Sequence, residues 1–362
     1  MNEFANIKSN ELKIFAVNMF KAIGCSDIDA NLASDVLIQA DLRGIDSHGV
    51  ARLSGYVRLY EAQRINTKPN IKIIRDKKSV FTIDGDAGLG LVVAPRAMDI
   101  AIEKTHHFGS GFASVSNSNH FGIAAYHAMK ALEHTYIGMA MTNASPLVAP
   151  TNSKERMLGT NPICYAIPAG DSLPFVIDMA SSAAANGKLE IAERKNKAIP
   201  QGWLETKDGQ PSNDPRDLKS GGYLLPLGSD KDHGSHKGYG MGALVDILSG
   251  VLSGANFGPW VPPFVSFLPV LPELPGKGLG HFLGAMDVDG FMDKNDFGKR
   301  MDIWINRFKS ATPIDPNYPV IIPGEPEFNA HKQRSQSGIP IVEKVLTDLK
   351  EIAEKYHLDH PF

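Results

Sequence analysis

Strand-type runs alternate with helical patterns between residues 79 and 135, and this alternation constrains the fold more than any other feature of the chain. "SVFTIDG" (79–85) and "GFASVSNS" (111–118) are typical of strands, whereas "PRAMDIAIEKTHHF" (95–108) and "IAAYHAMKALEHT" (123–135) repeat apolar residues at helical spacing. Strands that alternate with helices predict an α/β fold. Further strand-type runs follow at 137–144, 163–169 and 175–180.

Both ends of the chain have helical patterns. Two amphipathic helices are predicted over 9–24 and 26–44, the second with Ser26 as its N-cap. A third is expected over about 50–64, and the tail (337–358) returns to helix and is predicted to pack against the first helices.

The net charge, the apolar segments and the cysteines of the chain limit the classes of function that it can have. The net charge of −3 over 362 residues leaves no basic footprint, so we expect no nucleic acid partner. The most apolar region (238–260) carries Asp246 and several glycines, and is interpreted as a packed interior helix and a loop rather than a membrane span. The N-terminus lacks a signal-type apolar core. The two cysteines fit free thiols in a reducing compartment, and we expect a cytoplasmic protein.

"RGIDSHGVAR" (43–52) holds the first candidate site. If a helix starts with Ser47 as its N-cap, then His48, Arg52 and Tyr56 share one face, because they are spaced four residues apart. The free N–H groups of the first turn together with Arg52 favour a carboxylate, and an imidazole beside it suits proton transfer. The alternative is a capping serine, a surface histidine and a solvated arginine.

Three other places could carry chemistry. His120 lies in "SVSNSNHFG" (114–122), at a strand-to-helix loop of the kind where α/β active sites cluster, although it could be a surface residue. Asp178 ends a strand before a run of small residues; it could bind a ribose hydroxyl or a cofactor amide, or cap the next helix. His236 and Lys237 precede a helix and could face a pyrophosphate, or Lys237 could simply be solvated.

Several familiar motifs are absent. "GLGLVV" (88–93) has valine where a dinucleotide fingerprint needs a third small residue, so no Rossmann fingerprint is predicted. "DVDGFMDKND" (287–296) places Phe291 at a ligand position of a calcium loop. His106 and His107 are adjacent and cannot share a helix face, and we expect no metal site.

The order of the motifs is more specific than any one of them. "DLRGIDSHGVARL", "SNHFGIAAY", "LGTNPICYAIP", "FVIDMASSAAANGK" and "HKGYGMGALVDIL" together resemble the malate/L-lactate dehydrogenase family of 2-hydroxyacid oxidoreductases, over roughly residues 10–330. The resemblance implies a non-Rossmann nicotinamide-binding fold with a mixed sheet, and a homodimer. We expect a helical region (1–68 and 333–362), a substrate/core α/β domain (69–122 and 290–332) and an NAD(P)-binding domain (123–289).

The resemblance assigns roles by motif. His48 and His120 are the two acid/base candidates, and either could transfer the proton. Ala125, where a glycine is frequent, and the extra acidic residues of 284–297 depart from the family pattern. The substrate carboxylate would be held by Ser47, Arg52 and Tyr56, and NAD or NADP by Asn143, Ser145, Asp178, Met179, Ala180, His236, Lys237, Pro323, Gly324 and Glu325.

The function predicted on this basis is reversible hydride transfer between a nicotinamide and a small 2-hydroxy/2-oxo acid. Malate/oxaloacetate is the first substrate expected, because the chain most resembles the malate-type members. Lactate, ureidoglycolate and sulfolactate dehydrogenases, and a cyclic imino-acid reductase, are alternatives on the same site. A metal-dependent hydrolase or lyase and a non-catalytic binding protein are alternatives of other classes.

Overall fold

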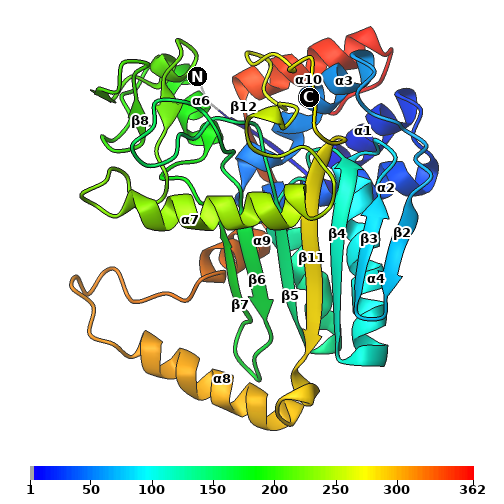
Figure 1. Ribbon diagram of the computed structural model, residues 1–362, viewed down its shortest axis with the longest axis vertical. Coiled ribbons are helices and arrows are strands. Elements are labelled where there is room, and N and C mark those ends of the chain that lie inside the picture. The colour runs from blue at the N-terminus through cyan, green and yellow to red at the C-terminus, as the bar shows by residue number, and fades with distance from the viewer. Residues whose placement is uncertain (1–3) are drawn as a thin grey trace.

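The computed structural model describes residues 4–362, and within them seven strands form one mixed sheet (Figure 1). Strands β3 and β4 are parallel, and every other neighbouring pair is antiparallel. The predicted α/β class with a mixed sheet is confirmed. In spatial order the strands are β2 (Lys72–Lys77), β3 (Val80–Asp84), β4 (Ser110–Ser118), β11 (Leu279–Asp287), β5 (Tyr136–Thr142), β6 (Ile163–Ile167) and β7 (Phe175–Met179).

Helices cover both faces of this sheet. Successive side chains of a strand point to opposite faces. Ala140 therefore lies in the core cluster under α4 (Gly90–Phe108) and α5 (Ala124–Met129), while its neighbours Met139 and Met141 pack with Val245 of α7 (Ser235–Asp246). Figure 1 shows α7 crossing the strands on the opposite side from α4. The sheet takes strands from both the 69–122 and the 123–289 segments, and the predicted domain division stays a prediction.

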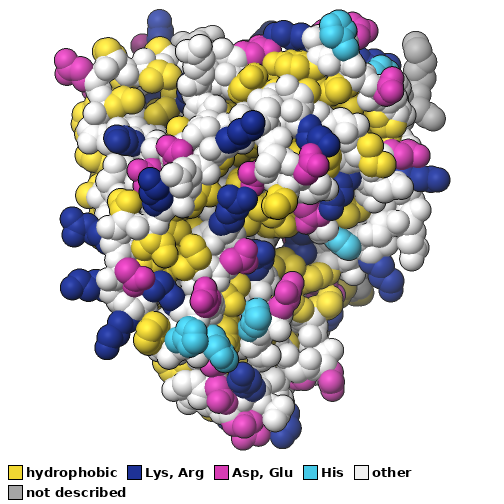
Figure 2. All heavy atoms as spheres, turned by 90° about the vertical axis from the view of Figure 1, so that its right-hand side faces the viewer, with side chains coloured by type: hydrophobic (Ala, Val, Ile, Leu, Met, Phe, Trp, Pro, Cys, Tyr) yellow, Lys and Arg dark blue, Asp and Glu magenta, His cyan; other side chains and the backbone are white. Residues whose placement is uncertain are grey.

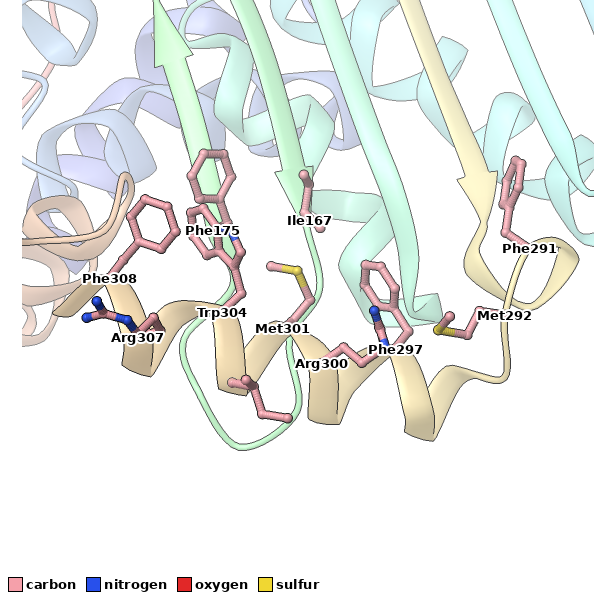
Figure 3. Close-up of a pocket in the computed structure, with 11 residues that line it drawn as sticks. Ile167, Phe175, Phe291, Met292, Phe297, Arg300, Met301, Trp304, Arg307 and Phe308 are labelled. Atoms are coloured by element: carbon pink, nitrogen blue, oxygen red, sulfur yellow. The ribbon is translucent and has the colours of Figure 1, made fainter. Parts of the chain in front are cut away.

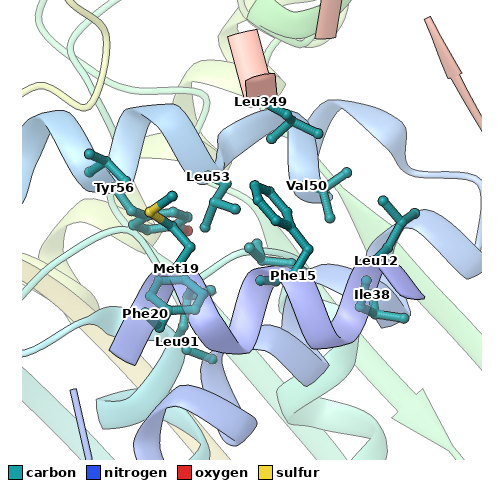
Figure 4. Packing of buried hydrophobic residues seen from close by; sticks show 14 of the residues in the cluster. Leu12, Phe15, Met19, Phe20, Ile38, Val50, Leu53, Tyr56, Leu91 and Leu349 are labelled. Atoms are coloured by element: carbon teal, nitrogen blue, oxygen red, sulfur yellow. The ribbon is translucent and has the colours of Figure 1, made fainter. Parts of the chain in front are cut away.

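The two ends of the chain build a helical region on one end of the sheet. It contains α1 (Ser9–Ala22), α2 (Asp27–Leu42), α3 (Leu53–Glu61) and α10 (Glu343–Lys355), and the short strands β1 (Phe4–Ile7) and β12 (Ile339–Val342) pair antiparallel. As predicted, the tail packs against the N-terminal helices, because Leu349 shares a core with Phe15. Val50, Leu53 and Tyr56 point into the same core (Figure 4). Ser26 caps α2, as expected.

A smaller lobe lies beside the sheet. It contains α6 (Asn186–Arg194) and the short strands β8 (Leu204–Glu205), β9 (Pro211–Ser212) and β10 (Tyr223–Leu224). The chain then continues through α7, α8 (Lys294–Lys309) and α9 (Glu325–Ser337). No helix of residues 4–362 is long and apolar enough to cross a membrane. On the face beside β2, Lys and Arg side chains are interspersed with Asp and Glu (Figure 2).

Three predicted helices differ from the structure. The third begins at Leu53 rather than near residue 50, because Gly49, with a ψ of −147°, separates two 3₁₀ turns before it. The tail first forms β12, since Pro340 and its β-branched neighbours favour extended backbone. The helix of the 238–260 region continues to residue 251 as a π-helix, but it is not an interior helix. Only one side of this helix is buried. Its other side exposes four large apolar side chains, those of Leu244, Ile247, Val251 and Leu252.

An apolar groove separates α8 from the ends of β6 and β7. It encloses about 850 Å³, and the side chains of Phe175, Trp304 and Phe308 gather at one end of it (Figure 3). Trp304 and Phe308 stack with ring centroids 4.1 Å apart. A groove this apolar on the surface is typical of a place where another surface packs.

Candidate active site

The segment that carries Ser47, His48 and Arg52 is held in place by a residue of α2. It consists of two 3₁₀ turns, Asp46–His48 and Val50–Arg52. The buried carboxylate of Asp41 on α2 accepts a hydrogen bond from Val50 N at 2.8 Å, and burial raises the pKa of Asp41 well above its usual value. A Cβ at position 49 would lie 1.8 Å from Asp41 Oδ1, so only glycine fits there.

The same segment is tied to the C-terminal region, and its serine has another role than the one predicted. Arg334 of α9 donates to the carboxylate of Asp46 and, at 2.6 Å, to the carbonyl of Asp41. Ser47 is not an N-cap, which corrects the sequence prediction; its Oγ instead lies 2.9 Å from Nδ1 of His48. The side chain of Ser47 therefore pairs with His48 and caps no helix.

His120 is placed by the turn that follows β4. Asn119, which is buried, donates from Nδ2 to the carbonyls of Ala87 and Gly88, each at 3.0 Å. At the start of α4, a Cβ on Gly90 would lie 2.0 Å from the carbonyl oxygen of Asn119. Gly90, the second glycine of "GLGLVV", therefore has a structural role, since the absence of a side chain lets α4 pack directly against the loop that carries His120.

The structure brings His48 and His120 together. Their rings are 5.7 Å apart between centroids and nearly parallel, at 21°. Oη of Tyr56 lies 2.6 Å from Nδ1 of His120, and Gly122 N lies 3.4 Å from the same nitrogen. Tyr56 is fully buried and burial raises its pKa, so its phenol keeps its proton and donates. Because Nδ1 of His120 faces two donors, the neutral ring carries its hydrogen on Nε2.

Both imidazoles are neutral near pH 7. Burial lowers the pKa of His48 from 6.5 to about 3, and the charge of Arg52 acts in the same direction. Burial also lowers the pKa of His120 well below 6.5, helped by His48 and Arg52. A neutral imidazole can accept a proton from an alcohol, and its N–H can donate to an oxygen.

Arg52 supplies a positive charge beside this pair. Its Nε donates to the carbonyl of Ser47, which fixes the guanidinium next to the 3₁₀ turns. Its Nη2 lies 3.2 Å from Oε2 of Glu190, a residue of α6. Its side chain is 16% exposed and lines a surface pocket together with Glu190 and Phe264.

Phe264 lies against His120 and lines the pocket that contains Arg52. Its ring centroid lies 4.5 Å from that of His120 and 5.2 Å from that of Tyr56. The loop is held by Arg58, which donates to the carbonyl of Phe264, and by Ser145, whose Oγ accepts from Phe264 N at 2.9 Å. The proline-rich passage 259–275 therefore brings the ring of Phe264 against His120 and Tyr56.

Asp178 connects the end of β7 to the histidine region. Its Oδ2 accepts from Ala125 N at 2.8 Å, in the first turn of α5, five residues after His120. The carboxylate still has an exposed edge, although the surrounding protein raises its pKa. Met179 and Ala180 follow it and are half-buried.

Two predicted cofactor residues have their side chains engaged inside the protein. Asn143 donates from Nδ2 to the carbonyl of Asn256 at 2.7 Å and accepts at Oδ1 from Gly280 N at 3.0 Å. Ser145 accepts from Phe264 N, as described above. Both residues are buried, and in this structure they join the sheet to the loops over it.

The remaining predicted residues lie on elements other than those that carry the histidines. His236 and Lys237 are exposed in the first turn of α7. The carbonyl of Pro323 accepts from Val176 N at 3.0 Å, which places this segment against β7, two residues before Asp178. Gly324, with a φ of +96°, directly precedes α9, and Glu325 pairs with Lys309 at 2.7 Å.

Comparison with known proteins identifies the family. A model described as malate/L-lactate dehydrogenase matches residues 7–350. The chain belongs to this family. A malate dehydrogenase of Pyrococcus abyssi is 42% identical over 97% of the chain and 95% of that relative. The solved malate dehydrogenase of Entamoeba histolytica has a TM-score of 0.92 and 32% identity, covering 99% of this chain and 100% of its own. The sulfolactate dehydrogenase of Methanocaldococcus jannaschii has a TM-score of 0.87 and 34% identity, covering 98% of both chains.

Sequence reasoning missed several residues of this dehydrogenase's candidate site. Asp41 and Glu190 lie in ordinary helical patterns, and their positions become meaningful only when the helices pack. Phe264 lies in a proline-rich loop, and nothing in its neighbours points to His120. The one available signal was Gly55, since a Cβ there would lie 2.5 Å from the ring of Phe264, but a lone glycine in a helix does not name its partner.

Proposed function

We propose that this dehydrogenase transfers a hydride between C2 of a small 2-hydroxy acid and C4 of the nicotinamide of NAD or NADP. The observation that carries the proposal is the pair His48 and His120, two neutral imidazoles with Arg52 beside them and the ring of Phe264 against His120. A guanidinium next to proton-transfer groups suits a substrate that has a carboxylate adjacent to the reacting carbon.

The protein's own residues then have distinct tasks. Arg52 binds the substrate carboxylate, and its bond to the carbonyl of Ser47 fixes the distance from that anion to the imidazoles. One neutral imidazole accepts the hydroxyl proton during oxidation. Tyr56 holds His120 with its Nε2–H available to the substrate oxygen. General acid–base help of this kind contributes about 10²- to 10⁴-fold, and positioning supplies much of the rest.

The residues present fit a dinucleotide. The exposed edge of Asp178 can accept from an amide or a hydroxyl, and the small side chains after it leave room for a large ligand. His236 and Lys237 place donors, and in Lys237 a positive charge, at the first turn of α7, where the backbone N–H groups favour a pyrophosphate. When bound, the nicotinamide supplies the hydride acceptor or donor.

Malate/oxaloacetate is the substrate pair that we propose, because relatives 42% and 40% identical are named malate dehydrogenase. Sulfolactate is the second candidate, since a relative 36% identical is named malate/(S)-sulfolactate dehydrogenase.

The test follows NADH and NADPH absorbance with oxaloacetate, sulfopyruvate, pyruvate and a cyclic imino acid. Oxidation with oxaloacetate, lost in Arg52→Ala, would support the proposal. No oxidation with any acceptor would overturn it, and unchanged kcat/KM in Arg52→Ala would overturn the clamp.

We also propose a homodimer. The apolar groove along α8 supports this, because a second copy that seats on it would remove exposed surface such as Trp304 from water. Light scattering of the purified protein measures the mass directly. A monomer at working concentrations would contradict this proposal.

A cytoplasmic location is proposed as well. Cys25 and Cys164 are both free and buried, and burial raises the pKa of each thiol, which suits a reducing compartment. Fractionation of the source cells, followed with an antibody against the protein, tests the location.

A further inference from the structure

A buried arginine lies close to the predicted cofactor residue Asp178. Arg43 directly follows α2 and is 5% exposed, and within residues 4–362 the Nε of its guanidinium has no hydrogen-bond partner. Buried polar groups are nearly always hydrogen-bonded, and a guanidinium keeps its positive charge at any physiological pH. The charge of Arg43 must therefore be stabilised by groups at longer range.

Packing places this charge beside the ends of β6 and β7. The guanidinium carbon of Arg43 lies 4.7 Å from the ring centroid of Phe328, a residue of α9. Phe328 packs against the core cluster that contains Cys164 of β6 and Ala125 of α5. Both of these residues are neighbours of Asp178, because Cys164 is its cross-strand partner and Ala125 N donates to its Oδ2. Arg43 and Asp178 therefore flank the same part of the core.

The groups around Asp178 come from four elements. Ala125 N of α5 donates to it, Glu327 faces it from α9, Arg43 faces it from the end of α2, and Cys164 of β6 is a thiol that burial keeps neutral. Burial raises the pKa of Asp178 to about 6, the bond from Ala125 and the charge of Arg43 lower it, and Glu327 raises it. Arg43 is thus the positive charge in a set that otherwise favours the protonated acid.

The charge of Asp178 decides what its exposed edge can do. An ionised carboxylate only accepts hydrogen bonds, whereas the protonated form carries an O–H donor. Because Oδ2 already accepts from Ala125 N, Oδ1 is the atom that remains for a ligand, and a proton on Asp178 would sit there. A protonated Asp178 would then present a hydrogen to the N–H or O–H of the cofactor.

We propose that Arg43 is a positioning residue of the cofactor site, whose buried charge keeps Asp178 ionised so that Oδ1 accepts from a donor group of NAD or NADP. The inference rests on the proposed function only in taking Asp178 as a contact of the cofactor. The competing explanation is that Arg43 merely packs α2 against Phe328. Its loss would then weaken cofactor binding by the same factor at every pH.

The test is fluorescence titration of the full chain with NADH, and separately with NADPH, between about pH 8.5 and about pH 6. Binding should weaken as the pH falls through the pKa of Asp178. Over this range we expect the dissociation constant to rise about twofold in the wild type and about tenfold in Arg43→Met, because the titration of Asp178 moves up by about one pH unit. Arg43→Gln, which keeps polar atoms without the charge, should behave like Arg43→Met, and Arg43→Lys like the wild type.

Two further variants isolate the contribution of Asp178. Asp178→Asn measures the pH dependence that comes from other groups, such as the exposed His236, and Arg43→Met added to it should leave that dependence unchanged. Infrared difference spectra between proteins with and without Asp178→Asn follow the same titration when no cofactor is bound. The matched control is Arg96→Met, since Arg96 pairs with Asp29 at the other end of α2, about 20 Å away, and it should show the wild-type profile.

The outcomes separate this inference from the proposed function. The same pH dependence in the wild type, Arg43→Met and Arg43→Gln would overturn the inference and leave the proposed function untouched. The steeper dependence in both variants, together with no reduction of any 2-oxo acid, would leave the inference standing and overturn the proposed function. Absence of binding of either nucleotide to every one of these proteins would overturn both.

Discussion

Replacing His281 with glutamine removes a buried titratable group next to the loop that carries His120. His281 lies on β11 and is fully buried; its Nε2 lies 2.7 Å from Ser118 Oγ and its Nδ1 2.8 Å from Thr142 Oγ1. Its ring stacks on Phe121, with centroids 4.9 Å apart. Burial lowers the pKa of His281 from 6.5 to about 3. The folded protein therefore keeps this ring neutral at pH values where the unfolded chain binds a proton.

The sign and the size of the effect follow from this shift. Because the unfolded chain binds more protons between pH 6.5 and about 3, acid favours unfolding, and the free energy of unfolding falls as the pH drops through that window. Between pH 7 and pH 5 the loss from this one histidine is about 2 kcal/mol. The value would be nearly the same for a folded pKa of about 4, because at pH 5 the folded ring is still almost entirely neutral.

The assay is urea unfolding of the wild type and His281→Gln at pH 7 and pH 5, at one protein concentration. The variant is expected to be less stable at pH 7 by about 1–3 kcal/mol, from altered hydrogen bonds and packing. Its deficit should shrink by about 2 kcal/mol at pH 5. His106→Gln, at an exposed position of α4, is the control and should show no such change. Parallel pH dependences of wild type and His281→Gln would refute the reasoning.

Three further outcomes are expected. In Gly49→Ala the added Cβ collides with the carboxyl group of Asp41 and displaces the turn that carries His48. We expect kcat/KM for oxaloacetate to fall about 10²-fold while the circular dichroism spectrum stays unchanged. An unchanged kcat/KM would contradict this expectation. Because the pKa values of His48 and His120 are lowered, kcat/KM for reduction should keep rising as the pH falls below 6.5, while that for oxidation should stay level until the pH is well below 6.5. A reduction profile that levels off above pH 7 would argue against neutral imidazoles. Trp304→Asp should dissociate the proposed dimer by light scattering, whereas Ile14→Asp, at another exposed apolar position, should not; a dimeric Trp304→Asp would move the interface elsewhere.

Much of the fold was predictable because its signals are local. The alternation of strands and helices between residues 79 and 135 predicted β3, α4, β4 and α5, since side-chain period and turn residues reflect which face is buried. The strand β11 escaped prediction, although it lies at the centre of the sheet. It comes after a long proline-rich loop, and four of its nine residues, "LGHFLGAMD", are glycine, histidine or aspartate, which do not suggest a strand.

The candidate site divides in the same way. The sequence by itself determined that His48 and Arg52 are close together, because only three residues lie between them. It also determined that His120 follows shortly after a strand. Only the tertiary structure decided that the two imidazoles meet, that Tyr56 fixes the proton on one of them, and that Glu190 and Phe264 arrive from distant segments. Those contacts span 64 to 144 residues of chain, and they depend on how whole elements pack, a property that no short stretch of sequence encodes.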